Sequence, residues 1–176
     1  MRTMENWLRC EETERAFTHC LQCKLPLVEL AEAWLVNKEF QKDECVLEYA
    51  ICQPCRDSVT NQLSEESKES VRRFLEQEID WQERMREFLF SPNLVERFDA
   101  CIACRTPRDE TAGFAISALY DSGGFLTTGA LPLLICHACT GRIRETLSVE
   151  SRAVWSNFVN QHFSGPPDDN QFPGLF

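Results

Sequence analysis

Apolar and polar positions alternate along residues 114–120, and this run leads directly into a polar segment with two glycines at 121–124. Such alternation predicts a half-buried strand, and glycines in a tight turn supply the positive φ that a hairpin needs. The apolar stretch 131–135 then provides the return strand. Residues 33–36 and 45–51 follow the same order earlier in the chain. The sequence therefore predicts two β-hairpins.

Helical periodicity follows each hairpin. Ser64 and Ser148 are placed as N-caps, with apolar residues after them at spacings of three and four, which is the pattern of an amphipathic helix. After Ser64 this pattern continues almost to Pro92, so it predicts one long helix that links the two hairpin regions. A short N-terminal helix is also expected. The apolar positions of the long helix are Val71, Phe74, Leu75, Ile79, Met85, Phe88 and Leu89.

Eight of the ten cysteines form two sets of one pattern, in which two Cys-x-x-Cys pairs are separated by 28 residues in the first set and 31 in the second. Two thiolates three residues apart can bind one tetrahedral ion, and two such pairs complete the closed shell that structural zinc prefers. We therefore expect two zinc ions, one per set. The first set is Cys20, Cys23, Cys52 and Cys55, and the second is Cys101, Cys104, Cys136 and Cys139.

The similarity between the two halves extends beyond the cysteines. Adding 81 to the numbers of the first Cys-x-x-Cys region matches Phe17 to Phe98 and Pro26 to Pro107, and adding 84 to the second region matches Ser64 to Ser148. The three extra residues in the second half are placed at the 121–124 turn. Agreement over so many positions indicates a tandem repeat.

The order of a cysteine knuckle, a hairpin and a helix-borne cysteine pair resembles the treble-clef group of zinc fingers. This resemblance covers both repeats and implies an α+β fold stapled by two metal ions, without implying a function. The predicted units are a first repeat with its N-terminal and linking helices (1–90), a second repeat (91–164) and a C-terminal tail (165–176).

Iron is the competing metal, because the distances between the pairs are also near those of rubredoxin. Rubredoxin and zinc-ribbon knuckles place glycine directly after the second cysteine, whereas the residues here are Lys24, Arg56, Arg105 and Thr140. Zinc is therefore favoured. The spacing leaves open whether the repeats exchange ligands.

Other candidate residues have simpler explanations. Cys10 and Cys45 match no cysteine in the other repeat, so we expect small buried side chains rather than ligands or nucleophiles. His137 lies inside a Cys-x-x-Cys and could replace a ligand, but its counterpart is Gln53, which favours a solvent-facing spacer. The three histidines are scattered and offer no general base.

The formal net charge of -10 opposes general binding to phosphate backbones, which needs clustered lysine and arginine. The alternative is a local face of arginines, including Arg142 and Arg144, on an otherwise acidic protein. No apolar run long enough to span a membrane is present, and the N-terminal residues do not have the pattern of a leader peptide. We therefore expect a cytoplasmic protein with metal-bound rather than disulfide-bonded cysteines.

The predicted function is that of a non-enzymatic, zinc-stabilised adaptor or regulator that binds another protein. The tail supports this prediction because Phe172, Leu175 and Phe176 follow an acidic, proline-rich stretch and could bind a partner. The same side chains could instead contact the protein's own surface. The alternatives are a nucleic-acid-binding zinc-finger regulator and a thiol redox protein, since a Cys-x-x-Cys at a helix start also lowers the thiol pKa in oxidoreductases.

Overall fold

Five antiparallel strands form one sheet that runs through both repeats. The computed structural model describes residues 2–91 and 93–164. The strands are β1 (Trp34–Gln41), β2 (Glu44–Cys52), β3 (Gly113–Tyr120), β4 (Leu126–Thr127) and β5 (Leu133–Cys136). Their order is β2-β1-β3-β4, and β5 also pairs with β3. Both predicted hairpins are present, so the α+β prediction with a cysteine knuckle, hairpin and helix-borne pair in each repeat is confirmed.

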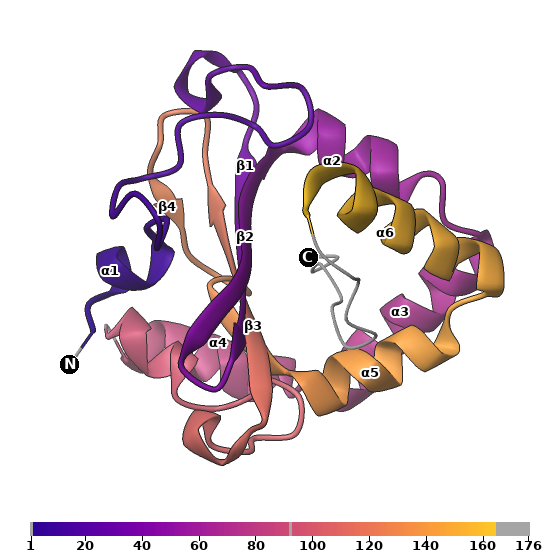
Figure 1. The fold of residues 1–176 in the computed structure, drawn as a ribbon. Coiled ribbons are helices and arrows are strands. Elements are labelled where there is room, and N and C mark those ends of the chain that lie inside the picture. The colour runs from indigo at the N-terminus through magenta and orange to yellow at the C-terminus, as the bar shows by residue number, and fades with distance from the viewer. Residues whose placement is uncertain (1, 92, 165–176) are drawn as a thin grey trace.

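Helices cover both faces of this sheet (Figure 1). Helices α2, α3, α5 and α6 lie on one side, and α1 and α4 lie on the other. The α-helices are α1 (Met4–Leu8), α2 (Gln53–Thr60), α3 (Glu65–Glu78), α4 (Trp81–Phe90), α5 (His137–Thr146) and α6 (Val149–His162). Short 3-10 helices are η1 (Leu27–Glu29), η2 (Leu94–Phe98) and η3 (Arg108–Glu110). In the part of the chain described, no helix is both long and apolar enough to cross a membrane.

The repeats meet where β1 pairs with β3, so the first strands of the two hairpins are direct neighbours. Phe40 and Phe114 are paired in the register, and their rings stack with centroids 5.0 Å apart. On the opposite face, Ser117 Oγ donates a hydrogen bond of 2.6 Å to Asn37 Oδ1. The two repeats therefore share one continuous sheet and one core.

Strand β1 is buried on both faces, including its polar residues Asn37, Lys38 and Glu39. The ammonium group of Lys38 contacts the Arg9 carbonyl at 2.5 Å and the carboxylates of Glu11 and Glu48 at 2.5 and 3.3 Å. Burial lowers the pKa of Lys38, whereas the nearby Cys45 and Glu48 favour its charged form. The strand predicted at 33–36 therefore extends to Gln41, because each polar residue finds a partner from another segment.

The repeats also meet at the N-terminal ends of α3 and α6. The N-caps Ser64 and Ser148 accept hydrogen bonds from Ser67 N and Ser151 N in their own helices. Across the junction, Ser64 N donates to Ser151 Oγ and Ser148 N donates to Ser67 Oγ, both at 2.9 Å. Ser64 and Ser67 occupy the same positions in the first repeat as Ser148 and Ser151 in the second. The two contacts are therefore equivalent, and the junction is symmetric.

The prediction of a single long helix between the repeats is wrong. The chain forms α3 and α4, separated at Ile79, whose backbone is extended (φ -105°, ψ 125°). Ile79 is buried, and the Asp80 carboxylate accepts a hydrogen bond of 2.9 Å from Glu83 N, so it caps a new helix. Apolar periodicity continues across the break, which is why the sequence pattern does not reveal it.

The return strand of the second repeat is interrupted, whereas β2 of the first repeat is continuous. A hairpin turn forms at the predicted place, with Gly124 at φ +83° and a hydrogen bond of 3.0 Å from Gly124 N to Asp121 O. Strand β4 then pairs with the end of β3, and residues 128–132 leave the sheet before β5 begins. Residues 128–132 are called the excursion between β4 and β5, and their carbonyl groups bind two arginines described below.

Candidate metal centres

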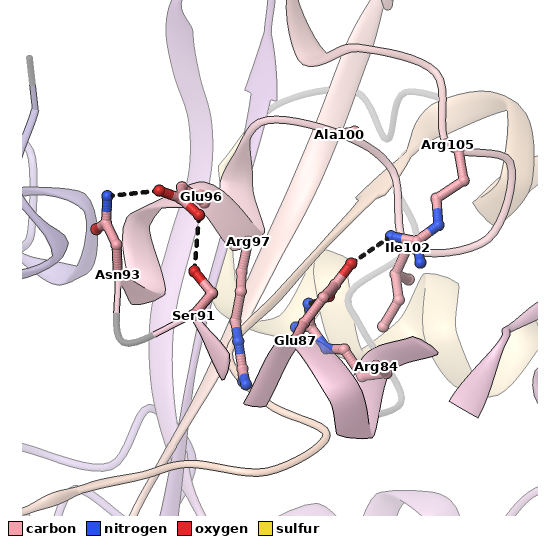
Figure 2. A pocket seen from close by; sticks show the side chains of 9 residues that line it. All are labelled: Arg84, Glu87, Ser91, Asn93, Glu96, Arg97, Ala100, Ile102 and Arg105. Carbon is pink, nitrogen blue, oxygen red and sulfur yellow. Dashed lines mark hydrogen bonds and ion pairs between the residues drawn. The ribbon is translucent and has the colours of Figure 1, made fainter. Parts of the chain in front are cut away.

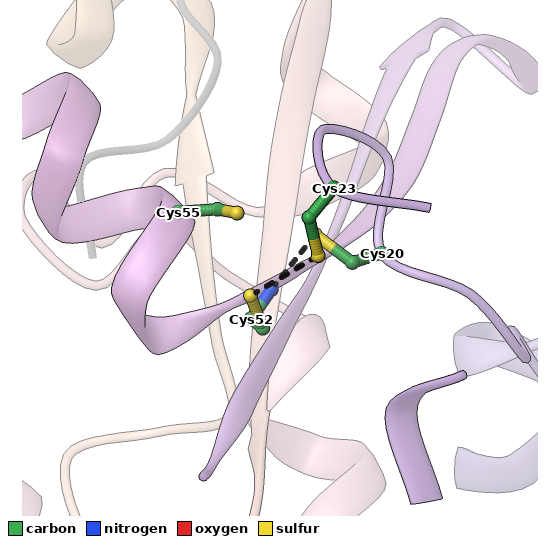
Figure 3. A group of neighbouring side chains, drawn as sticks. All are labelled: Cys20, Cys23, Cys52 and Cys55. Atoms are coloured by element: carbon green, nitrogen blue, oxygen red, sulfur yellow. Dashed lines mark hydrogen bonds between the residues drawn. The ribbon is translucent and has the colours of Figure 1, made fainter. Parts of the chain in front are cut away.

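The first cysteine cluster combines a loop, a strand end and a helix start. Cys20 and Cys23 lie in the knuckle before η1, Cys52 ends β2, and Cys55 lies in the first turn of α2 (Figure 3). Their four sulfur atoms all lie within 4.8 Å of one another, and Cys23 Sγ and Cys52 Sγ are 3.9 Å apart. The four side chains thus converge on one point.

Backbone contacts fix the knuckle to the strand that carries the other cysteine pair. Leu21 N donates to Ala50 O at 2.8 Å, and Cys52 N donates to Cys20 Sγ at 3.4 Å. Lys24 N donates to Cys20 O at 3.0 Å and closes the turn, with Lys24 at φ 63° in the left-handed region. Glycine adopts this left-handed conformation without strain, whereas lysine does so only at a cost.

The second cluster repeats these contacts in the second half of the chain. Ile102 N donates to Leu134 O at 2.8 Å, Cys136 N donates to Cys101 Sγ at 3.4 Å, and Arg105 has φ 61°. Cys104 Sγ and Cys136 Sγ are 3.6 Å apart, and all four sulfurs again lie within 4.8 Å. Each cluster takes its four cysteines from one repeat, so the repeats do not exchange them.

The donor sets fit a tetrahedral ion. A zinc–sulfur bond of about 2.3 Å in a tetrahedron places the sulfurs roughly 3.8 Å apart, which agrees with the 3.9 and 3.6 Å observed. Backbone N–H groups already point at Cys20 and Cys101, as a thiolate ligand requires. All eight predicted cysteines are therefore brought together as two groups that could each hold a metal ion.

The thiols within a cluster differ in acidity. Burial opposes ionisation of Cys20, but N–H groups of Cys52, Cys23 and Gln22 outweigh it and lower the pKa of Cys20 to about 7. Burial raises the pKa of Cys52 to about 11. In the second cluster, hydrogen bonds from Cys136 and Cys139 lower the pKa of Cys101. The thiolate form of the first cysteine in each knuckle is therefore stabilised, and a divalent cation would deprotonate ligands that still carry a proton.

His137 is not the solvent-facing spacer that we expected. Its side chain is 13% exposed, and Nε2 lies 2.9 Å from Oε1 of Glu39, a buried residue of β1 in the other repeat. The ring also lies against Gly113 on β3, where an added Cβ would be 2.4 Å from His137 Nδ1 and 2.6 Å from the Phe40 carbonyl oxygen. His137 lies outside the second cysteine cluster and links the helix that carries Cys139 to the first repeat.

The Gly113→Ala variant should be destabilised by about 1–3 kcal/mol, the usual cost of overpacking, because the Phe40 backbone cannot move away. The measurement is a urea denaturation midpoint. Gly141→Ala is the matched control, since its Cβ would meet nothing within 4 Å in α5, and it should be neutral or stabilising. Equal midpoints for the two variants would contradict the packing at Gly113.

Cys10 and Cys45 lie outside both clusters and are half-buried instead of fully buried. Both thiols donate to Glu48, Cys10 Sγ to Oε1 at 3.0 Å and Cys45 Sγ to Oε2 at 3.8 Å. Burial, followed by the nearby Glu48 charge, raises the pKa of Cys45 to about 11. The pair belongs to the polar group around Lys38, whose long-range contacts have no local sequence signal.

Comparison with protein-family models, with curated proteins and with solved structures gives no match for this chain.

Proposed function

We propose that this chain binds two zinc ions, one in each cysteine cluster, and acts as a non-enzymatic adaptor or regulator through protein–protein interaction. Each repeat has the element order of a treble-clef finger: a knuckle, a hairpin, and a helix that begins at the second cysteine pair. The observation that carries the proposal is that both four-cysteine sets are complete and joined to one continuous sheet.

Zinc is the metal that best fits these sites. Four thiolates in a tetrahedron suit zinc or iron, but both knuckles place a charged residue, Lys24 or Arg105, where rubredoxin-type knuckles have glycine. The second pair of each site also begins a helix, whose N-terminal partial positive charge favours the thiolate form. A shell filled by four protein ligands is typical of structural zinc, whereas catalytic zinc keeps an open position.

A protein partner is favoured over nucleic acid because the candidate arginines are engaged by carboxylates. Arg142 pairs with Glu78 at 2.8 Å, Arg72 with Glu69 and Glu76, and Arg105 with Glu87. Together with the net charge of -10, these pairs weaken attraction to phosphate. The tail residues Phe172, Leu175 and Phe176 lie outside the described residues, and their binding to a partner in the cytoplasm is part of the proposal.

Native mass spectrometry of the purified protein should count two zinc ions, and the denatured chain should carry none. The Cys45→Ser variant should still bind two ions, because Cys45 is in neither cluster. A folded, reduced protein without metal would contradict the zinc proposal, and so would the visible absorption of ferric thiolate.

The adaptor role is tested by affinity capture with the full-length, zinc-loaded protein from cells of its source. We expect one defined partner protein, with less of it captured when Phe172, Leu175 and Phe176 are replaced by serine. Sub-micromolar binding to duplex DNA at about 150 mM salt would favour the nucleic-acid alternative. Catalysed thiol–disulfide exchange would favour the redox alternative.

A further inference from the structure

An ordinary amphipathic helix buries its apolar side chains and exposes its charged ones, whereas helix α4 exposes apolar side chains and buries an arginine. Its one buried residue is Arg84, whereas Trp81, Met85, Phe88 and Leu89 are exposed, Leu89 to 65%. Spacings of four, three and one place these four apolar residues on one face. In α3 and α6, by contrast, large apolar residues such as Phe74 and Phe158 are buried. A contiguous apolar face on a surface helix typically marks an interaction site.

An arginine pocket adjoins this apolar face. The pocket has a volume of about 120 Å³, and its charged lining residues are Arg84, Glu87, Glu96, Arg97 and Arg105 (Figure 2). The Arg97 guanidinium lies over the ring of Phe88, with Cζ 5.9 Å from its centroid. Phe88 therefore contacts the pocket and also belongs to the apolar face, so the two features form one surface.

Backbone carbonyls of the excursion between β4 and β5 fix the buried arginines. Arg97 Nη1 donates to Gly129 O and Leu131 O, both at 2.9 Å, and Arg84 Nη2 donates to Ala130 O at 3.3 Å. Arg84 Nη2 also contacts Pro132 O. This excursion occurs in the second repeat, so the arginines are fixed by a feature that β2 of the first repeat does not share.

The pocket contains more positive than negative charge. Three arginines face two glutamates, and Glu87 alone binds both Arg84 (3.1 Å) and Arg105 (3.0 Å). Burial first, and then the neighbouring Arg97, lower the pKa of Arg84 to about 10. Glu96 accepts hydrogen bonds from Ser91 and Asn93. Arg97 is 93% buried, and its Nη2 has no hydrogen-bond partner within residues 2–91 and 93–164.

A carboxylate is the group that this pocket lacks. A buried guanidinium without a full set of acceptors is costly, and a carboxylate supplies strong, charge-assisted hydrogen bonds. The volume of about 120 Å³ accommodates an acidic side chain. It is well below the roughly 300 Å³ or more of typical cofactor and small-molecule sites.

We propose that α4 and the arginine pocket together form a docking surface for a segment of a partner protein that carries large apolar side chains beside an acidic one. The apolar side chains contact Trp81, Met85, Phe88 and Leu89, and the carboxylate enters the pocket. This inference rests on the proposed adaptor function, because it identifies the chemistry of the partner that the adaptor binds.

The test is a selection from a displayed library of random 16-residue peptides against the full-length, zinc-loaded protein. Enriched peptides should combine Asp or Glu with at least two large apolar residues. The most enriched peptide is then labelled, and its binding is followed by fluorescence anisotropy. The double variant Met85→Gln, Leu89→Gln should weaken binding at least tenfold, and Arg105→Gln should weaken it about fivefold. Phe125→Gln and Arg72→Gln, which change an exposed aromatic and an exposed arginine elsewhere, are the matched controls and should bind normally.

A second measurement links the peptide carboxylate to the pocket. Changing the acidic residue of the peptide to its amide should weaken binding to the unaltered protein about fivefold, but much less to the Arg105→Gln variant. Equal losses with both proteins would place the carboxylate elsewhere and overturn the proposal. Failure to enrich acidic, apolar peptides would also overturn it.

Two other occupants would give different results. If a second copy covers α4, sedimentation will show a dimer that the Met85→Gln, Leu89→Gln variant dissociates. If the chain's own tail covers it, serine at Phe172, Leu175 and Phe176 will strengthen peptide binding. Either result overturns the proposal. Partner capture from cells that survives the α4 substitutions would also overturn it, and would leave the adaptor role standing.

Discussion

Replacing Cys136 with serine is expected to unfold both repeats together. Cys136 belongs to the second cluster and also ends β5, where it pairs with Phe114 of β3. Strand β3 in turn pairs with β1 along its whole length. Under the proposed zinc binding, loss of one thiolate weakens a site whose binding energy is on the order of 10 kcal/mol in small zinc domains. This is comparable to the whole stability of a typical domain, about 5–15 kcal/mol.

Hydrogen exchange followed by mass spectrometry distinguishes cooperative from local unfolding. Peptides from β1 and β2 should lose protection at the same rate as those from β3 and β5. Cys45→Ser is the control, because it removes a thiol from outside both clusters and should retain protection throughout. Protected β1 and β2 beside an unprotected second repeat would show that the repeats fold independently.

The Trp7→Ala variant is expected to lose about 3–5 kcal/mol of stability, the usual cost of emptying a large aromatic site. The indole packs edge-on against Phe40 of the first repeat and Phe98 and Phe114 of the second, with centroids 5.6, 5.8 and 6.3 Å away. The guanidinium of Arg108 also lies over it at 4.9 Å. One side chain from α1 therefore fills a site formed by both repeats.

For a protein of this size, such a loss lowers the melting temperature by roughly 10 °C, which differential scanning calorimetry measures directly. Zinc content should stay at two ions, because Trp7 is not a ligand. Phe125→Ala is the matched control, since its ring is 73% exposed and its loss should have little effect. A small change for Trp7→Ala would mean that α1 does not complete the shared core.

The cysteine clusters could be predicted from the sequence because their geometry is local. A Cys-x-x-Cys fixes two sulfurs within one turn, and the hairpin brings the second pair back to the first. The extent of β1 could not be predicted, since Asn37, Lys38 and Glu39 look like surface residues. Their partners are Ser117, Glu11 and Glu48, and His137, which lie elsewhere in the sequence.

Helix α4 shows a different limit of sequence patterns. The spacing of Met85, Phe88 and Leu89 correctly indicates a helix with one apolar face, but periodicity does not say whether protein or solvent covers that face. Arg84 donates to the carbonyls of Ala130 and Pro132, which lie 46 and 48 residues away in the sequence. The sequence pattern alone therefore could not predict the proposed docking surface.

The symmetry of the contacts between the repeats has a structural consequence. Strand β1 pairs with its counterpart β3, and Ser64 binds Ser151 as Ser148 binds Ser67. In a homodimer of one such unit, each of these contacts would form twice about a two-fold axis. The chain therefore has the arrangement expected of two linked copies of one unit, in which covalent linkage makes their association independent of dilution. Linkage in one chain also allows the two halves to differ: the first has a plain hairpin, and the second has the excursion that fixes the arginines.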